Sequence, residues 1–290
     1  MNHTIALNDG TTIPQLGFGT LNVPTDRSGS DGATAITANV VRDALQIGYR
    51  HVDTAQMYGN ESGVGRGLAS SGVTRSEIHV TSKLSNANHC ADAVARSFEE
   101  TLIKLGVAQL DLFLMHWPLP TRYEGDFVST WLAMLELKRN GRLRSAGVSN
   151  FQPDHIHRIV TETGVTPAVN QFEVHPYFHN AAACHASAGY GIAIEAWSPL
   201  GQGTVLMDPV IERIARGLGK TPAQVVLRWH IQHQRIVFPK SMHKERMLEN
   251  FHIFDFELSE PAMKGIDALD RGEAGRIGPN PDVFDWVPVT

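Results

Sequence analysis

Residues 79–116 read HVTSKLSNANHCADAVARSFEETLIKLGVAQLDLFLMH and contain one strand, one helix and a second strand. The segments His79–Lys83 and Asp111–His116 are short, largely apolar runs of the kind that forms buried strands. Between them, Ala91–Leu105 repeats apolar residues at helical spacing, with charged residues on the other faces. The stretch therefore predicts a strand, a helix that returns along it, and a second, parallel strand.

The same unit repeats along the chain. The runs that favour strands are Gln15–Gly19, Arg50–Asp53, His79–Lys83, Asp111–His116, Leu143–Val148, Ala168–Gln171, Ile192–Trp197 and Ile236–Pro239, and segments of helical pattern lie between them. Eight strand-helix units predict a (β/α)8 barrel, of the TIM-barrel class, formed by residues 1–290 as a single domain.

A doubly wound open sheet repeats the same unit, so the pattern alone leaves both folds open. The first strand ends in LGFGTLN at 16–22, where Asn22 stands in place of the third glycine of a dinucleotide-binding fingerprint. This absence favours the barrel. Ahead of it, Thr4–Leu7 and Thr12–Pro14 flank an Asp-Gly turn and predict an N-terminal hairpin that caps the barrel bottom.

Composition narrows the possible functions. The chain has 25 basic and 30 acidic residues and a net charge of −5, so we expect no nucleic acid or anionic membrane partner. Its start, MNHTIALNDG, lacks the basic and apolar regions of a signal peptide. Cys90 and Cys184 do not make a disulfide framework. We expect a monomeric, cytoplasmic protein that acts on a small molecule.

Two other motifs are excluded. The triplet Gly219-Lys220-Thr221 looks like the end of a phosphate-binding P-loop, but Ile214 occupies the position of the required first glycine. We interpret Gly219 as the end of one helix and Pro222 as the start of the next. The 14 histidines include no HExxH pattern, so we expect no metal site.

Polar residues collect at the C-terminal ends of the predicted strands. They are Asp53, Lys83, His116, Ser149, Asn150, Gln171, Lys240 and Ser241. Singly, Asp53 could be a helix N-cap, Lys83 a surface lysine and His116 a core histidine. In a barrel they share one mouth, together with the nearby phenol of Tyr58, and active sites of this fold lie there.

The motifs around these residues resemble those of the aldo-keto reductases, and of bacterial 2,5-diketo-D-gluconate reductases in particular. They are GYRHVDTAQMYGNE at 48–61, TSKL at 81–84, LMHWP at 114–118, GVSNF at 147–151, NQFEVHP at 170–176, AWSPLGQG at 196–203 and PKS at 239–241. The resemblance implies NADPH-dependent reduction of an aldehyde or ketone on a barrel without a Rossmann domain.

The resemblance implies a catalytic set of Asp53, Tyr58, Lys83 and His116. Reduction of a carbonyl creates an alkoxide that needs a proton, and Tyr58 would supply it as general acid. The Lys83 cation would lower the pKa of the phenol, while Asp53 holds Lys83 in place. His116 would hydrogen-bond the carbonyl oxygen.

The resemblance also implies the cofactor contacts. They are Ser149, Asn150, Gln171 and Trp197 at the nicotinamide, Ser198, Leu200, Gly201, Gln202 and Gly203 at the pyrophosphate, and Lys240, Ser241, Arg246, Glu249 and Asn250 at the adenosine 2′-phosphate. Amides satisfy a carboxamide, an aromatic face suits a flat ring, and cations suit a phosphate.

The substrate pocket is expected at Leu21, Asn22, Trp117, Phe284 and Trp286. Leu21 stands where many members of the family carry an aromatic residue. Two other functions stay open at this point: an NADPH-binding sensor or interaction subunit with vestigial activity, and a lyase that forms a Schiff base on a lysine at a strand end.

Overall fold

The computed structural model describes residues 3–25 and 31–288, and its centre is an eight-stranded parallel sheet. The strands pair in chain order: β3 (Phe18–Gly19), β4 (His51–Asp53), β5 (His79–Leu84), β6 (Leu110–Met115), β7 (Leu143–Ser149), β8 (Val169–Glu173), β9 (Ala193–Trp197) and β10 (Ile236–Val237). A parallel bridge between Leu16 and Val237 joins the two edges, with Gly17 N donating to Val237 O at 2.8 Å. The predicted (β/α)8 barrel is confirmed.

The first and last strands are shorter than predicted. The runs Gln15–Gly19 and Ile236–Pro239 keep only two residues each as regular strand. Pro239 has no N–H to donate, and its carbonyl meets Gly19 N only at 3.4 Å, so the regular ladder stops after Val237. These two strands form the seam that closes the barrel.

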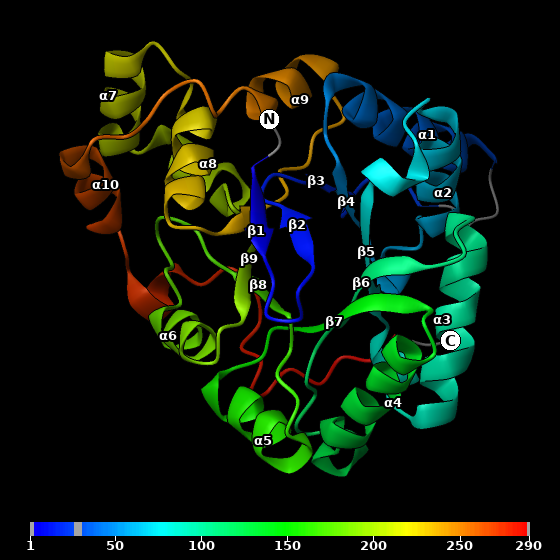
Figure 1. Ribbon diagram of the computed structural model, residues 1–290. Helices are drawn as coiled ribbons and strands as arrows, with labels where there is room; N and C mark the ends of the chain where they lie inside the picture. Colours follow the sequence, from blue (N-terminus) through cyan, green and yellow to red (C-terminus); the bar gives the residue numbers. More distant parts are fainter. Residues whose placement is uncertain (1–2, 26–30, 289–290) are drawn as a thin grey trace.

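A ring of helices surrounds the strands (Figure 1). The helices are α1 (Asp31–Ile47), α2 (Glu61–Ser70), α3 (Ala91–Leu105), α4 (Phe127–Arg139), α5 (Pro153–Thr163), α6 (Ala181–Gly189), α7 (Pro209–Leu218), α8 (Pro222–Gln232), α9 (Lys244–Phe251) and α10 (Glu260–Asp267). In α3, whose bounds match the prediction, Val94, Phe98 and Leu102 face the core because they share one side of the helix.

The N-terminal hairpin closes the bottom of the barrel, as predicted. Strands β1 (Thr4–Ala6) and β2 (Thr12–Pro14) pair antiparallel across a turn in which Gly10 has φ 84°. Ile13 is fully buried in a cluster with Val169 and Ile236, the first residues of β8 and β10. The hairpin lies across the centre of the ring in Figure 1.

The Gly219 segment is a helix junction, as interpreted from the sequence. Helix α7 ends at Gly219 with φ 63°, a conformation that glycine adopts without steric cost. Thr221 then caps α8 through a reciprocal pair of hydrogen bonds with Gln224, and Pro222 is the first helical residue.

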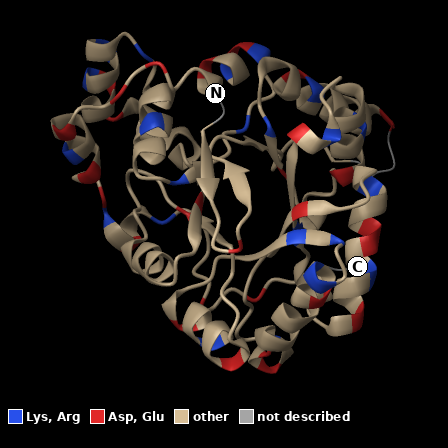
Figure 2. Ribbon diagram, viewed as in Figure 1, with Lys and Arg blue, Asp and Glu red and all other residues tan. Residues whose placement is uncertain are grey.

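Charged residues are interspersed over the helices (Figure 2). Within residues 3–25 and 31–288, no helix combines the length and the apolar character that crossing a bilayer requires. The same residues contain no group of His, Cys, Asp and Glu that could hold a metal ion. Cys90 and Cys184 are both free thiols.

Candidate active site

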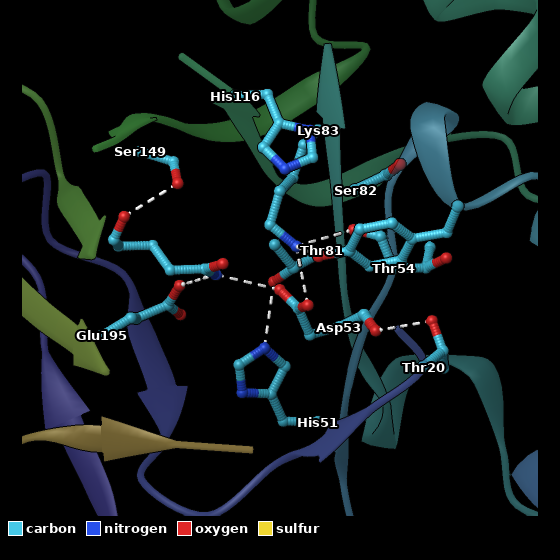
Figure 3. A network of polar contacts seen from close by, with 12 residues as sticks. Thr20, His51, Asp53, Thr54, Thr81, Ser82, Lys83, His116, Ser149 and Glu195 are labelled. Carbon is cyan, nitrogen blue, oxygen red and sulfur yellow. Dashed lines mark hydrogen bonds and ion pairs between the residues drawn. The ribbon is translucent and has the colours of Figure 1, made fainter. Parts of the chain in front are cut away.

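The barrel mouth brings the four predicted catalytic residues together, and Figure 3 labels Asp53, Lys83 and His116 among them. Asp53 ends β4, Lys83 lies in β5, His116 follows β6, and Tyr58 comes from a short 3-10 helix, Gln56–Tyr58. The Lys83 side chain is fully buried, and its Nζ lies 2.6 Å from Oδ1 of Asp53. A buried cation of this kind needs a close anion, because the protein interior solvates charge poorly.

The three protons of the Lys83 ammonium have three acceptors. Nζ donates to Asp53 Oδ1 at 2.6 Å, to the Thr54 carbonyl at 3.0 Å and to the Tyr58 hydroxyl oxygen at 3.2 Å. The Tyr58 oxygen therefore accepts from Lys83, and the proton of the phenol stays available to another group. This arrangement suits a tyrosine that acts as an acid.

The pKa of Tyr58 differs from the sequence-based expectation. Burial raises the pKa of the phenol, Lys83 lowers it and Asp53 raises it, and the balance lies above the usual value. The expectation of a lowered pKa was wrong because desolvation of the phenolate outweighs the attraction of one cation. For Lys83, burial lowers the pKa, but Asp53 and Tyr58 together raise it above its usual range, so the lysine stays protonated.

His116 is a neutral ring next to Tyr58. Burial, Lys83 and His89 hold the pKa of His116 well below its usual range. The His116 and Tyr58 rings meet edge to face, with their centroids 5.9 Å apart. A neutral imidazole keeps one N–H that can donate to a carbonyl oxygen without adding a charge.

The four residues expected at the nicotinamide form one hydrogen-bonded group. Asn150 Nδ2 donates to the His116 carbonyl at 2.9 Å and to Ser149 Oγ at 3.1 Å, and Asn150 Oδ1 accepts from Trp197 Nε1 at 2.8 Å. Ser149 Oγ donates to the Gln171 carbonyl at 2.8 Å. Both protons of the Asn150 amide are engaged, so a carboxamide bound here would have to displace one of these bonds.

Glu195 joins this group from β9, and the sequence analysis missed it. Gln171 Nε2 donates to Glu195 Oε2 at 2.7 Å and to Asp53 Oδ2 at 3.0 Å. Burial raises the pKa of Glu195 to about 8, and the charge of Asp53 adds to this effect. The sequence did contain one indication of Glu195, because it is an acid within the apolar run Ile192–Trp197. Side chains alternate along a strand, so an acid at this position can point into the barrel.

The loop after β9, expected at the pyrophosphate, has unusual backbone geometry. Ser198, Gly201, Gln202 and Gly203 all have positive φ. Gly201 N donates to Ser198 O and Gly203 N to Leu200 O, both at 2.8 Å, so these two N–H groups are used inside the loop.

The residues expected at the 2′-phosphate follow β10 and continue into α9. Lys240 and Arg246 are exposed, and neither has an ion-pair partner among the described residues. Ser241 Oγ accepts from His243 N at 3.0 Å. Glu249 accepts from Thr221 Oγ1 at 2.7 Å, while Asn250 is buried. Two cations without a partner on one segment suit an anionic ligand.

The expected substrate residues divide into two groups. Trp117 and Phe284 are in contact, with ring centroids 4.2 Å apart, and Trp286 is half exposed beside Tyr123. Leu21 and Asn22 extend into solvent from the end of β3. We call residues 276–288 the C-terminal segment. The aromatic side chains of this segment thus lie beside residues of the loop after β6.

A buried carboxylate, the Glu173 side chain, anchors the C-terminal segment; Glu173 belongs to the motif NQFEVHP, but the sequence analysis gave it no role. Glu173 Oε1 accepts from Ile277 N at 2.7 Å, and its Oε2 accepts from Gly278 N at 2.8 Å. His175 Nε2 lies 3.0 Å from Oε1. A Cβ on Gly278 would lie 2.4 Å from the Trp197 ring, so only glycine fits there.

A barrel with this buried lysine, carboxylate, tyrosine and histidine at its mouth matches a known family. The model of the Aldo/keto reductase family matches residues 15–271, and the chain belongs to this family.

Three similar proteins illustrate the relationship. An aldo-keto reductase of Mycolicibacterium smegmatis is 47% identical over 99% of this chain and 100% of its own. The methylglyoxal reductase DkgA of Escherichia coli is 41% identical over 97% of both chains. A crystal structure of a Gox0644 mutant in complex with NADPH has a TM-score of 0.91, with 42% identity over 99% of this chain and 100% of that one.

Proposed function

We propose that this protein reduces an aldehyde or ketone to the alcohol with NADPH as hydride donor and Tyr58 as proton donor. The observation that carries the proposal is the hydrogen bond from Lys83 Nζ to the Tyr58 oxygen at 3.2 Å. It leaves the phenol proton free for the substrate and places a cation beside the tyrosinate that remains afterwards.

The proposed reaction balances as one hydride and one proton. When bound, NADPH supplies a hydride to the carbonyl carbon, and the electron pair of the C=O bond moves to oxygen. Tyr58 gives its proton to that oxygen, and Lys83 stabilises the tyrosinate until water returns a proton. His116, as a neutral donor beside Tyr58, holds the carbonyl oxygen within reach of the phenol.

The residues present fit this cofactor. Lys240 and Arg246 would hold the 2′-phosphate, since both are exposed cations without an ion-pair partner in the described part of the chain. Gln171 Oε1 accepts no hydrogen bond from a described residue and would receive an N–H of the carboxamide. Trp197, half buried at the end of β9, would stack on the nicotinamide ring.

The lyase alternative needs a neutral amine at Lys83. The ammonium is instead fully buried, engaged by three acceptors and held protonated, so it is not a free nucleophile. For the same reason, borohydride should trap no substrate on Lys83.

The deciding assay follows NADPH absorbance with a panel of aldehydes, ketones and sugar acids. Relatives include a glyoxal reductase of Bacillus subtilis and the methylglyoxal reductase DkgA of Escherichia coli, so α-oxoaldehydes head the panel. We expect turnover with at least one compound, and we expect Tyr58→Phe to slow it by about 10²- to 10⁴-fold. Tight NADPH binding with flat traces across the panel would instead support the sensor function.

We also propose that the protein works as a monomer in the cytoplasm, without nucleic acid. The two free thiols and the interspersed surface charge support this assignment. Light scattering should give a mass near 31.8 kDa, and a dimer mass would contradict the monomer.

A further inference from the structure

Glu195 is a buried acid that the proposed mechanism does not use. Its side chain is fully buried in the barrel, and β9 places it opposite Gln171 of β8 in the strand register. Figure 3 shows Glu195 and Asp53 approaching each other from different strands, with dashed lines that meet at one nitrogen between them. That nitrogen is Nε2 of Gln171, which donates to both carboxyl groups.

The two carboxyl groups determine how the Gln171 amide is turned. A primary amide has two N–H donors on one side and a carbonyl oxygen on the other. Here Asp53 Oδ2 and Glu195 Oε2 accept both donors, at 3.0 Å and 2.7 Å. If the amide were flipped, its oxygen would face the Asp53 carboxylate, which pairs with Lys83 and has no proton to donate, and the bond to Asp53 would be lost. The amide oxygen must therefore point away from Asp53 and Glu195.

The charge balance agrees with an acceptor role for Glu195. The charged groups facing it are Asp53 from β4 and Lys83 from β5, while β10 pairs with it only through Ile236. The buried cation of Lys83 balances the charge of the Asp53 carboxylate and leaves none for Glu195. Burial raises the pKa of Glu195 to about 8. Near neutral pH Glu195 is therefore mainly a neutral acid, and with its proton on Oε1 the other oxygen, Oε2, accepts from the amide.

We propose that Glu195 is a positioning residue for the cofactor, which holds Nε2 of Gln171 inward so that Gln171 Oε1 accepts an N–H of the nicotinamide carboxamide. This inference rests on the proposed function, because it needs NADPH at the mouth. It assigns Glu195 a role that acts only through Gln171. The role should therefore vanish when Gln171 is replaced.

The first experiment compares Glu195→Leu with Glu195→Gln. Leucine has no acceptor, so the Gln171 amide is free to turn, and we expect the Kd of NADPH to rise roughly fivefold to tenfold. Glutamine keeps a neutral acceptor in the same place and should stay within about twofold of the wild type. Glu195→Thr, too short to reach Gln171, is a second truncation in case leucine is not accommodated.

Adenosine 2′,5′-bisphosphate is the matched control ligand, because it carries the phosphate but no nicotinamide. Its Kd should be the same in wild type and Glu195→Leu. Equal weakening of both ligands would mean that the variant disturbs the barrel in general, and this would overturn the inference.

A double-mutant cycle with Gln171→Leu tests whether Glu195 acts through the amide. In the Gln171→Leu background, Glu195→Leu should change the Kd of NADPH by less than twofold. A further fivefold loss would show that Glu195 acts by another route and would overturn the inference.

The wild-type protein separates this inference from the proposed function. Failure of the wild type to bind NADPH would refute both. Wild-type binding and turnover, with Glu195→Leu unchanged in NADPH affinity, would refute only the role of Glu195.

Discussion

Lys83→Met tests the central ion pair of the site. The Asp53 side chain is 3% exposed, and Lys83 is its one ion-pair partner among the described residues. Removing one member of a buried pair costs about 3 to 5 kcal/mol, because the other charge stays buried without compensation. Gln171 Nε2 still donates to Asp53 Oδ2, so we expect the lower end, about 3 kcal/mol, and a melting temperature lower by roughly 5 to 10 °C.

The same change should stop turnover. Without Lys83 the attraction that lowers the pKa of Tyr58 is lost, while the burial that raises it remains. We expect single-turnover hydride transfer at saturating NADPH to slow by about 10²- to 10⁴-fold.

The double variant Lys83→Met with Asp53→Leu separates stability from chemistry. Because no charge is left unpaired, the free energy of unfolding should recover most of the loss, while turnover stays as slow as in Lys83→Met. Recovery of turnover would refute the electrostatic role of Lys83. If Lys83→Met alone were as stable as the wild type, the expected cost of about 3 kcal/mol for leaving Asp53 unpaired would be wrong.

Four further predictions concern other parts of the site. Tyr58→Phe should keep the Kd of NADPH and lower kcat by about 10²- to 10⁴-fold, and near-normal single-turnover transfer would contradict proton donation by Tyr58. Arg246→Ala should raise the Kd of NADPH roughly tenfold and leave the Kd of NADH unchanged, whereas an equal rise for both cofactors would show that Arg246 does not bind the 2′-phosphate. Glu173→Leu should release Ile277 N and Gly278 N and raise the KM for substrate by roughly tenfold, more than it raises the Kd of NADPH, as steady-state kinetics would show. Burial lowers the pKa of His51 and of His89 to about 4, so the unfolded chain binds more protons below pH 6.5. The contribution of these two neutral rings to the free energy of unfolding should therefore be complete above pH 6.5 and should fall toward pH 4, by about 3 kcal/mol for each ring, an effect that the raised pKa of Glu195 offsets in part. A melting temperature that stays constant between pH 6.5 and pH 4 would contradict the burial of His51 and His89 as neutral rings.

The sequence predicted the parts of the protein that local patterns determine. Helix Ala91–Leu105 has the predicted bounds because its apolar spacing and the glycine after it are local signals. Asp53, Lys83 and His116 meet because parallel strands of one barrel place their C-terminal ends at the same mouth.

Buried carboxylates and the C-terminal segment could not be predicted in the same way. Glu173 and Glu195 lie inside strands, where the sequence shows an acid but not its partners from distant elements. Two of the partners of Glu173 are backbone N–H groups more than 100 residues away, at Ile277 and Gly278. The raised pKa of Tyr58 depends on burial, which also results from the complete fold.

The seam between β3 and β10 has a consequence for how the chain folds during synthesis. Gly19 lies against the carbonyl of Phe238, and a Cβ added to Gly19 would lie 2.7 Å from that oxygen. Strand β3 pairs with β4 on one side, but its other side meets a segment that is synthesised some 220 residues later. Closure is therefore expected as a late step, since contacts this distant in sequence form slowly. Lys240 and Ser241 follow this last strand directly, so the proposed phosphate site is completed only when the barrel closes. In refolding experiments, recovery of NADPH binding should lag behind recovery of helical circular dichroism, and simultaneous recovery would place closure early.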